Sequence, residues 1–285
     1  MILLTGATGY TGRFLLRRLA AGTVPFRCIV RPSSDRGEFN ALGVEYHIGD
    51  LEVPDSVRPA FVGVKKVLHL AHIRYAKTIV ECIDDTVEHL VMVSSLRRFS
   101  AVPSPSVEET INGEAHAASA RIPCTLLRAA MIYGPGDRNI SRMAAYLRRR
   151  AWIPVFGNGE YLQQPVYVED VVNVLLAVLE RPWAGGRSYA IAGAEALTYN
   201  CLIDRVGEAV GVRPRKMRIP LGTVLAGLWL AKRIGVNLSI DAEQIRRLSE
   251  DKAYSIAAAQ ADLDYTPLTF ASGLAQIYKS GVERG

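Results

Sequence analysis

The chain has 285 residues, of which 49% are hydrophobic and 22% are charged. A chain of this length can bury a substantial core, either as one large domain or as a domain with a smaller lobe. No apolar run reaches the roughly 18–20 residues that span a bilayer, so we expect no transmembrane segment. The formal net charge of +6 favours an anionic small molecule as a partner. The basic residues form short clusters without interleaved aromatic residues, which argues against nucleic acid as a partner.

The cysteines and the start of the chain bear on its location. Cys28, Cys82, Cys124 and Cys201 are scattered, with no C-x-x-C pair and no histidine at ligand spacing. We therefore expect reduced thiols and no metal site. A glycine-rich loop begins at Gly6, which leaves no room for a secretory signal before it. These features predict a cytoplasmic protein.

Short apolar runs alternate with amphipathic stretches through the first half of the chain, which is typical of βαβ units and a parallel sheet. The predicted strands cover Met1–Thr5, Phe26–Arg31, Val44–Ile48, Lys66–Leu70, His89–Val93 and Cys124–Leu127. The predicted helices between them cover Gly12–Ala21, Asp55–Phe61, Tyr75–Cys82 and Val107–Ala120. The sequence thus predicts an α/β fold with a Rossmann-type doubly wound parallel sheet.

The pattern loosens after the sixth predicted strand. Helices are predicted over Ser141–Arg149, Asp170–Leu179, Thr198–Val210 and Ser239–Leu248, with short strands near Val166–Val168 and Tyr189–Ile191. The apolar stretch Ile219–Ala231 is interpreted as a core or lobe helix, with docking to a partner or a membrane surface as the alternative. We expect residues 1–135 to form the sheet domain, with 163–180 returning to it. Residues 136–285 then form mainly a smaller, interleaved C-terminal α/β lobe.

The first predicted strand runs directly into glycines spaced G-x-x-G-x-x-G and then into a helix. Gly6 permits a tight turn, Gly9 lets the backbone approach a pyrophosphate, and Gly12 lets the helix pack closely on the strand. The helix N-terminus adds free N–H donors and the positive end of the helix dipole. The loop therefore predicts a dinucleotide-binding site. The neighbouring residues expected to contact the cofactor are Thr8, Tyr10, Thr11 and Arg13.

The residue at the end of the second predicted strand bears on the choice between the two nicotinamide dinucleotides. An Asp or Glu there would bind the ribose 2′-hydroxyl and repel a 2′-phosphate. The residue here is Arg31, with Ser33 close behind it, and a guanidinium and a hydroxyl suit a phosphate. We therefore predict NADP(H) in preference to NAD(H). The alternative is that Arg31 is a solvated strand end, because Asp35 lies nearby.

Residues after the other strands complete the expected cofactor site, because ligands collect at the carboxyl ends of parallel strands. The Asp50 carboxylate can accept the adenine amino group, and Leu51 can pack on the ring. Leu70, Ala71 and His72 follow the fourth strand and suit a backbone that runs close to the pyrophosphate. The remaining expected contacts are Ser94, Ala129 and Met131.

Together these motifs resemble the extended and atypical short-chain dehydrogenase/reductases, the NAD-dependent epimerase/dehydratase-like group. The resemblance covers nearly the whole chain, and the segments that carry it are TGATGYTGR, GDL, HLA, VMVSS, TLLRAAMIYGPGD and QPVYVEDVVNVLLAVLERP. The resemblance implies an NAD(P)-binding Rossmann domain in residues 1–135 and a substrate lobe mainly in 136–285. In that lobe Gln163, Gln164 and Tyr167 are candidates to face the substrate. The superfamily includes epimerases, dehydratases, reductases and cofactor-binding proteins, so the reaction stays open.

The usual catalytic pair of this family is missing. Its catalysts use a Tyr and a Lys spaced Y-x-x-x-K on the helix before the sixth strand, where the Tyr transfers a proton. Aligned through the family's glutamate, best matched by Glu114, these two positions fall on Ser106 and Thr110. Residues 78–132 contain neither a tyrosine nor a lysine, so the conclusion does not depend on the alignment.

Ser95, Arg97 and Tyr133 are the candidate catalytic residues instead. A guanidinium just beyond the fifth strand can stabilise a developing oxyanion, although it cannot donate a proton at neutral pH. Ser95 and Tyr133 would supply hydroxyl groups. The structural alternatives are a solvated or ion-paired loop for Arg97 and a packing role for Tyr133.

Three functions follow as hypotheses. The first is an atypical reductase that transfers hydride between NADP(H) and a carbonyl or an activated double bond of a small, anionic or nucleotide-sugar-like substrate, with water or substrate supplying the proton. The segment QPVYV-x-DV also resembles the accessory NADPH-binding subunit of respiratory complex I, which indicates a non-catalytic sensor or assembly protein as the alternative. A sugar-nucleotide epimerase or dehydratase is the third. By analogy with the family, the small residues of 115–120 permit a homodimer.

Overall fold

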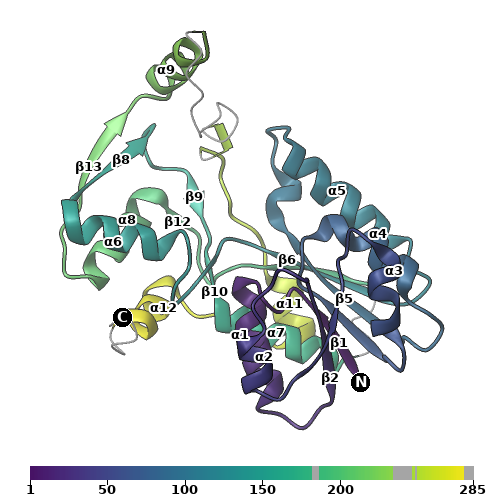
Figure 1. Cartoon of the computed structure of the whole chain (residues 1–285). Coiled ribbons are helices and arrows are strands. Elements are labelled where there is room, and N and C mark those ends of the chain that lie inside the picture. The colour runs from purple at the N-terminus through teal and green to yellow at the C-terminus, as the bar shows by residue number, and fades with distance from the viewer. Residues whose placement is uncertain (182–185, 234–245, 248, 279–285) are drawn as a thin grey trace.

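The structure is a computed structural model that describes residues 1–181, 186–233, 246–247 and 249–278. A parallel sheet of seven strands forms its larger part, in the spatial order β11-β6-β5-β4-β1-β2-β3 (Figure 1). The strands are β1 (Ile2–Thr5), β2 (Phe26–Val30), β3 (Glu45–Ile48), β4 (Lys66–His69), β5 (His89–Ser95), β6 (Cys124–Ala129) and β11 (Ser188–Ile191). The strand order reverses between β1 and β4, where ligands bind in open sheets of this kind. The sheet confirms the predicted Rossmann-type α/β fold.

Helices cover both faces of this sheet (Figure 1). One face carries α1 (Tyr10–Ala20), α7 (Val168–Leu179) and α11 (Ala257–Leu263). The other face carries α3 (Pro54–Val57), α4 (Ala76–Cys82) and α5 (Pro105–Ala118). Short helical segments in the connections are α2 (Gly37–Ala41), η1 (Arg58–Phe61), η2 (Ile73–Tyr75) and η3 (Leu96–Phe99).

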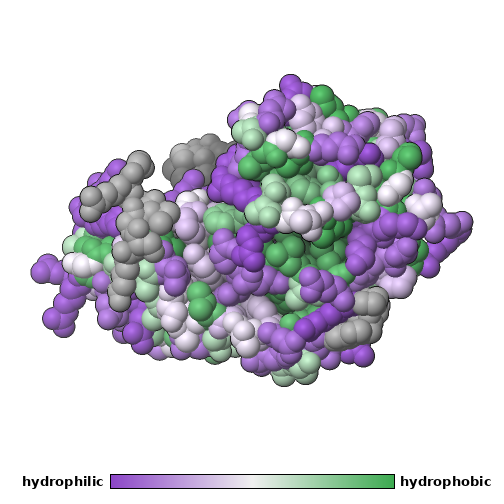
Figure 2. All heavy atoms as spheres, turned by 90° about the horizontal axis from the view of Figure 1, so that it is seen from below, coloured by the Kyte–Doolittle hydropathy of each residue, from purple (hydrophilic) through white to green (hydrophobic). Residues whose placement is uncertain are grey.

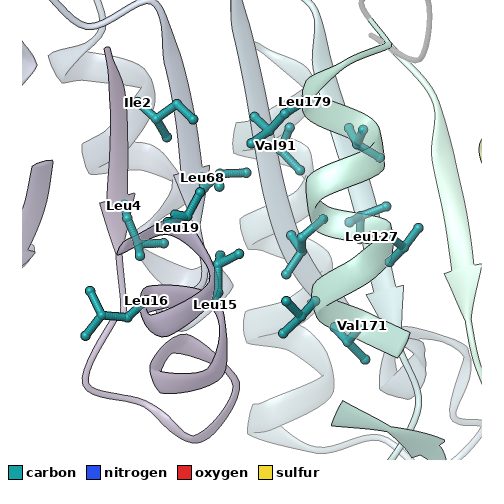
Figure 3. Close-up of a cluster of buried hydrophobic side chains, with 14 of the residues drawn as sticks. Ile2, Leu4, Leu15, Leu16, Leu19, Leu68, Val91, Leu127, Val171 and Leu179 are labelled. Atoms are coloured by element: carbon teal, nitrogen blue, oxygen red, sulfur yellow. The ribbon is translucent and has the colours of Figure 1, made fainter. Parts of the chain in front are cut away.

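The core beneath α1 and α7 follows from the helical spacing of their apolar residues. Leu15 and Leu19 of α1 lie on one helix face and belong to one buried cluster with Leu4 and Leu68 of the sheet and Val171 of α7 (Figure 3). Burial of each such side chain contributes about 1.5–3 kcal/mol. The resulting cluster fixes α1 on the sheet, and with it the glycine-rich loop at the start of α1.

A smaller lobe contains three two-stranded sheets and four helices of the described part of the chain (Figure 1). Its strands are β7 (Ile132–Tyr133), β8 (Trp152–Phe156), β9 (Leu162–Gln163), β10 (Val166–Tyr167), β12 (Leu197–Thr198) and β13 (Arg215–Ile219). Its helices are α6 (Ile140–Arg150), α8 (Tyr199–Ala209), α9 (Leu221–Arg233) and α12 (Phe270–Tyr278). The chain beyond residue 135 serves both parts, because α7, β11 and α11 join the large sheet. The division into 1–135 and 136–285 stays a prediction.

Several element boundaries differ from those expected. β5 and β6 each run two residues beyond the predicted ends, to Ser95 and Ala129. α5 begins two residues before the predicted start, because Ser104 caps it by accepting a hydrogen bond from the Val107 N–H at 3.2 Å, with Pro105 in the first turn. The helix predicted over Ser239–Leu248 lies almost wholly outside the described residues.

The apolar stretch Ile219–Ala231 falls largely on α9, which projects from the lobe in Figure 1. Its Trp229 is 61% exposed, so α9 is a lobe helix and not part of the core. Among the described residues, no helix has the length and apolar character needed to cross a membrane. On the face shown in Figure 2, hydrophobic side chains lie in patches bounded by hydrophilic ones.

A buried carboxylate ties α5 to the two strands that end beside it. Glu114 is only 3% exposed, and it accepts hydrogen bonds from Ser94 Oγ of β5 at 2.6 Å and from Arg128 Nη2 of β6 at 2.8 Å. Arg98 of η3 also donates to it. A buried charge is tolerated when it is paired and hydrogen-bonded in this way. The Glu114 cluster, made of these four residues, therefore fixes the carboxyl ends of β5 and β6.

We expect Gly113→Ala to destabilise the protein. A Cβ at Gly113 would overlap the carbonyl oxygen of Ile73, because α5 lies directly against η2 there. Overpacking of this kind costs about 1–3 kcal/mol, which outweighs the roughly 1 kcal/mol that alanine gains over glycine in an open helix. Urea unfolding measures the change, with Asn112→Ala at the exposed neighbouring position as the control. A more stable Gly113→Ala variant would contradict this close approach.

The Glu114 cluster also predicts a pH dependence of stability. Burial alone raises the pKa of Glu114, but hydrogen bonds from Arg128 and Ser94 outweigh it and lower the pKa overall. Such a group stabilises the fold above its unfolded pKa, about 4.3, and loses this contribution as the pH falls through the lower folded pKa. The wild type should therefore lose more stability than Glu114→Gln between neutral and acidic pH in urea unfolding. Glu108→Gln, at an exposed position of α5, serves as the control, and equal losses in wild type and Glu114→Gln would refute the prediction.

Candidate functional site

The glycine-rich loop after β1 lies against the loop after β4 without side chains between them. Gly6 has a φ of +75°, and a Cβ there would overlap the main-chain nitrogen of Ala71. A Cβ at Gly12 would overlap the carbonyl oxygen of Gly6, so α1 can start this close to the strand only with glycine. The two loops thus form a cradle of bare backbone, which fits a pyrophosphate.

The N-terminus of α1 opens onto this cradle. Its N-cap is Gly9, and no side chain caps the helix. The first N–H groups of a helix have no partner inside it and carry the positive end of the dipole, so they suit an anion. The Tyr10 hydroxyl is buried next to Gly134 and has no hydrogen-bond partner within the described residues.

A buried histidine aligns the two loops. The ring of His69 is fully buried, with Nδ1 2.8 Å from Thr5 Oγ1 and Nε2 3.2 Å from the carbonyl oxygen of His72. Burial lowers the pKa of His69 to about 4, so the ring is neutral at pH 7. His69 therefore joins the ends of β1 and β4. In the described part of the chain, no three His, Cys, Asp or Glu side chains are placed to hold a metal ion.

A cavity of about 350 Å³, here called the cradle cavity, lies at this end of the sheet. The predicted cofactor residues that line it are Gly6, Thr8, Gly9, Arg31, Asp50, Leu51, Leu70, Ala71 and His72. The predicted cofactor residues that do not line it are Tyr10, Thr11, Gly12, Arg13, Ser33, Ser94, Ala129 and Met131. Of these, Gly12 shapes the cradle and Ser94 belongs to the Glu114 cluster.

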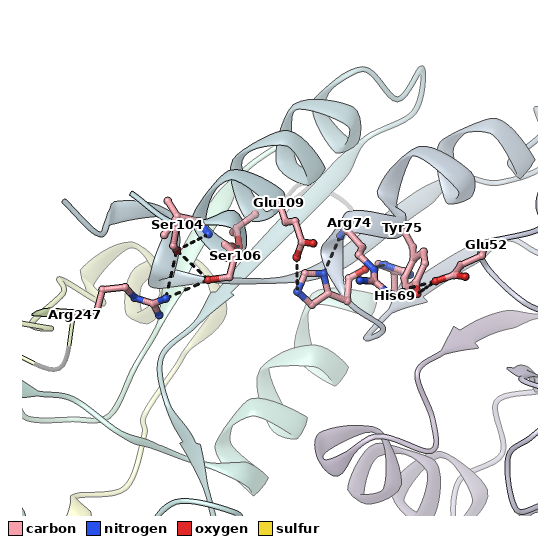
Figure 4. A network of polar contacts seen from close by, with 11 residues as sticks. Glu52, His69, Arg74, Tyr75, Ser104, Ser106, Glu109 and Arg247 are labelled. Carbon is pink, nitrogen blue, oxygen red and sulfur yellow. Dashed lines mark hydrogen bonds and ion pairs between the residues drawn. The ribbon is translucent and has the colours of Figure 1, made fainter. Parts of the chain in front are cut away.

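The polar side chains of the cradle cavity differ in the hydrogen bonds that they form. The Arg31 side chain is exposed and forms no hydrogen bond or ion pair with the described residues. The Asp50 carboxylate accepts a hydrogen bond from the Glu52 N–H at 3.0 Å. Arg74 also lines this cavity and was not predicted from the sequence. It donates to the Tyr75 hydroxyl at 2.6 Å and to Glu52 at 3.4 Å (Figure 4). Its position two residues after His72, a predicted cofactor residue, could have indicated that Arg74 belongs to the site.

A second cavity of about 340 Å³, here called the substrate cavity, lies at the carboxyl ends of β5 and β6. The predicted site residues that line it are Ser95, Arg97, Ala129, Met131, Gln163 and Gln164. Tyr133 does not line it. That tyrosine is fully buried, its ring centroid lies 5.0 Å from that of Phe270, and its hydroxyl donates to the Phe270 carbonyl oxygen at 3.4 Å. Tyr167 is likewise buried in the lobe core.

A further wall of the substrate cavity, not predicted from the sequence, is formed by Arg247, Glu250, Asp251, Lys252 and Tyr254. We call these residues the C-terminal wall. Hydrogen bonds join the wall to the rest of the site. Glu250 accepts hydrogen bonds from Ser100 Oγ and the Ala101 N–H, both at 2.7 Å. The Tyr254 N–H donates to Gln164 Oε1, also at 2.7 Å. The signal available in the sequence was the run of charged residues 246–252.

The two positions assigned to the family's Tyr and Lys hold small hydroxyl residues in the structure. The Ser106 Oγ accepts a hydrogen bond from Arg247 Nη1 at 3.1 Å. The buried Thr110 donates its hydroxyl to the carbonyl oxygen of Ser106 at 2.8 Å, inside α5. A guanidinium from the C-terminal wall therefore faces the helix position at which the resemblance expects a tyrosine.

Comparisons with known proteins agree with this architecture. The NAD(P)H-binding family profile matches residues 6–122, and the NAD dependent epimerase/dehydratase profile matches residues 109–192. The chain is 26% identical to the mitochondrial NADH dehydrogenase (ubiquinone) 1 alpha subcomplex subunit 9 of Dictyostelium discoideum, over 89% of this chain and 76% of that protein. It is 25% identical to the ceramide reductase of Caulobacter vibrioides, over 77% of this chain and 74% of that one.

Solved structures share the fold. The UDP-glucose 4-epimerase of Thermotoga maritima with UDP-glucose aligns with a TM-score of 0.74 at 18% identity, over 98% of this chain and 97% of that chain. Two successive family profiles, the glycine cradle and the sheet order point to one conclusion. The chain is an NAD(P)-binding, epimerase/dehydratase-like protein, similar to the extended and atypical short-chain dehydrogenase/reductases.

Proposed function

We propose that the protein is an NADP(H)-dependent reductase that acts on a carbonyl group of a small anionic molecule. The observation that supports it most is the pair of cavities at the carboxyl end of one parallel sheet, one at the glycine-rich loop and one that Ser95 and Arg97 line. A bound nicotinamide dinucleotide supplies the hydride in this chemistry. The relation to a ceramide reductase is in line with a reductive reaction.

Ser95 and Arg97 are the groups proposed to polarise the carbonyl oxygen. The Ser95 Oγ accepts a hydrogen bond from the Arg97 N–H at 3.2 Å, which leaves its own hydrogen free to donate to a substrate oxygen. The Arg97 guanidinium stabilises the negative charge that develops there. As the carbonyl carbon gains a hydride, its oxygen takes a proton from water, because arginine stays protonated at neutral pH. Tyr133 plays no part in this proposal, because its hydroxyl is buried against Phe270.

A second candidate function is a non-catalytic NADP(H)-binding subunit. The observation that favours it is the match over 89% of the chain to a protein named as a subunit of NADH dehydrogenase. Ser106 and Thr110 at the family's Tyr and Lys positions also suit a protein that binds a dinucleotide without turnover.

The two functions are separated by titrating the protein with NADPH, followed by fluorescence, and then adding pooled carbonyl and nucleotide-sugar metabolites. We expect saturable binding and then oxidation of NADPH, with an alcohol formed in equal amount. Binding without oxidation in any pool would favour the non-catalytic subunit, and absence of NADPH binding would contradict both functions.

Arg31 is proposed to select NADPH. We expect Arg31→Asp to weaken NADPH binding by about tenfold or more, because a charge-assisted contact to the 2′-phosphate is lost and a repulsive carboxylate is gained. NADH binding should change little or improve. Fluorescence titrations with both dinucleotides test this, with Arg149→Asp on the exposed end of α6 as a control for net charge. An unchanged ratio of the two affinities would remove the assignment.

A further inference from the structure

Arg247 reaches the start of α5 from a distant part of the sequence. Its Nη1 donates to Ser106 Oγ at 3.1 Å and to Ser104 Oγ at 3.4 Å (Figure 4). A guanidinium carries five N–H donors, and these two bonds use only those of Nη1. The three donors on Nε and Nη2 have no partner within the described residues. Arg247 is half-buried and lines the substrate cavity, so these donors remain for a ligand.

Arg97 lines the same cavity, and its side chain forms no hydrogen bond or ion pair within the described residues. Both guanidinium groups line one cavity, and their repulsion is reflected in the pKa of Arg97, which loss of solvent and the positive charge of Arg247 both lower. Glu109 counteracts this repulsion but lies 3.8 Å from Nε2 of His72, a residue that lines the cradle cavity. An anion placed between the two arginines would relieve the repulsion.

The carboxylates of the substrate cavity do not neutralise the two arginines. Glu250 accepts its hydrogen bonds from the loop after η3, and Asp251 accepts one from the Leu162 N–H at 2.8 Å. The Lys252 ammonium donates to the carbonyl oxygen of Arg247 at 2.7 Å. These three charged side chains fix the C-terminal wall, and none forms an ion pair with either arginine in the described structure.

We infer that Arg97 and Arg247 together bind an anionic group of the substrate, a carboxylate or a phosphate, within the substrate cavity. Planar guanidinium groups bind both kinds of anion through paired charge-assisted hydrogen bonds. The inference rests on the proposed function for the identity of the ligand as a substrate. Arg247 donates to Ser106, which stands at the position of the family's tyrosine, so a substrate-binding group takes the place of that tyrosine.

The test is the rate at which phenylglyoxal modifies individual arginines, read by peptide mass spectrometry. The full chain is treated in inorganic phosphate, in acetate, or in chloride at equal ionic strength. We expect phosphate or acetate to slow the modification of Arg97 and Arg247 severalfold over chloride and to leave Arg246 unchanged. The arm that protects identifies a phosphate or a carboxylate site. Equal rates in all three salts, or equal protection of Arg246, would overturn the inference.

Variants test whether the two arginines act together. In Arg247→Ala, half-protection of Arg97 should need about tenfold more anion, because one charge-assisted pair is lost. Arg247→Lys keeps the charge, so its anion concentration for half-protection of Arg97 should lie between those of the wild type and Arg247→Ala. Arg246→Ala, at the exposed neighbouring position, should need the same concentration as the wild type. Unchanged protection of Arg97 in a folded Arg247→Ala variant, as judged by circular dichroism, would refute the shared site.

The same samples separate this inference from the proposed function. NADPH affinity, measured by fluorescence, should be equal in wild type and Arg247→Ala, because Arg247 does not line the cradle cavity. Protection by an anion without reduction of any carbonyl would leave the anion site standing while the reductase function fails. Reduction of a carbonyl without protection by either anion would leave the reductase function standing while the anion site fails.

Discussion

The contact between the backbone of Gly6 and that of Ala71 is the constraint on which the site depends. It exists because Gly6 has no side chain to separate the two loops and because His69 joins the ends of β1 and β4. The core under α1 fixes one loop, and the packing of Gly113 against Ile73 places α5 beside the other. An anion at the start of α1 therefore meets main-chain N–H groups that are already aligned.

The geometry of the substrate cavity depends on the buried carboxylate of Glu114. Glu114 fixes Ser94 and Arg128, and with them the strand ends that carry Ser95 and Ala129 into the substrate cavity. The C-terminal wall closes this cavity from the other side through bonds to both parts of the protein. The Glu114 cluster therefore fixes one side of the cavity, and the hydrogen bonds of the C-terminal wall fix another. Within the described residues, neither Arg97 nor Arg247 of this cavity forms an ion pair with a carboxylate.

Local signals in the sequence predict the sheet and the cradle, since apolar runs and glycine spacing are properties of short segments. They place the ends of β5 and β6 too early, because Ser94, Ser95 and Arg128 look like loop residues although Glu114 pairs two of them. Arg247 lies 141 residues from Ser106 in the sequence, so no local pattern indicates their contact. Tyr133 looks like a free phenol in the sequence, yet packing against Phe270 makes it a core residue.

A crystal structure of the protein with NADP⁺ would test the central claim most directly, namely that the Gly6–Gly12 cradle holds a dinucleotide whose reacting end faces the substrate cavity. We predict the pyrophosphate against the Gly6 and Ala71 loops, the 2′-phosphate beside Arg31, and the nicotinamide next to Ser95 and Arg97. A dinucleotide bound elsewhere, or bound with its nicotinamide beside Arg31, would contradict this assignment.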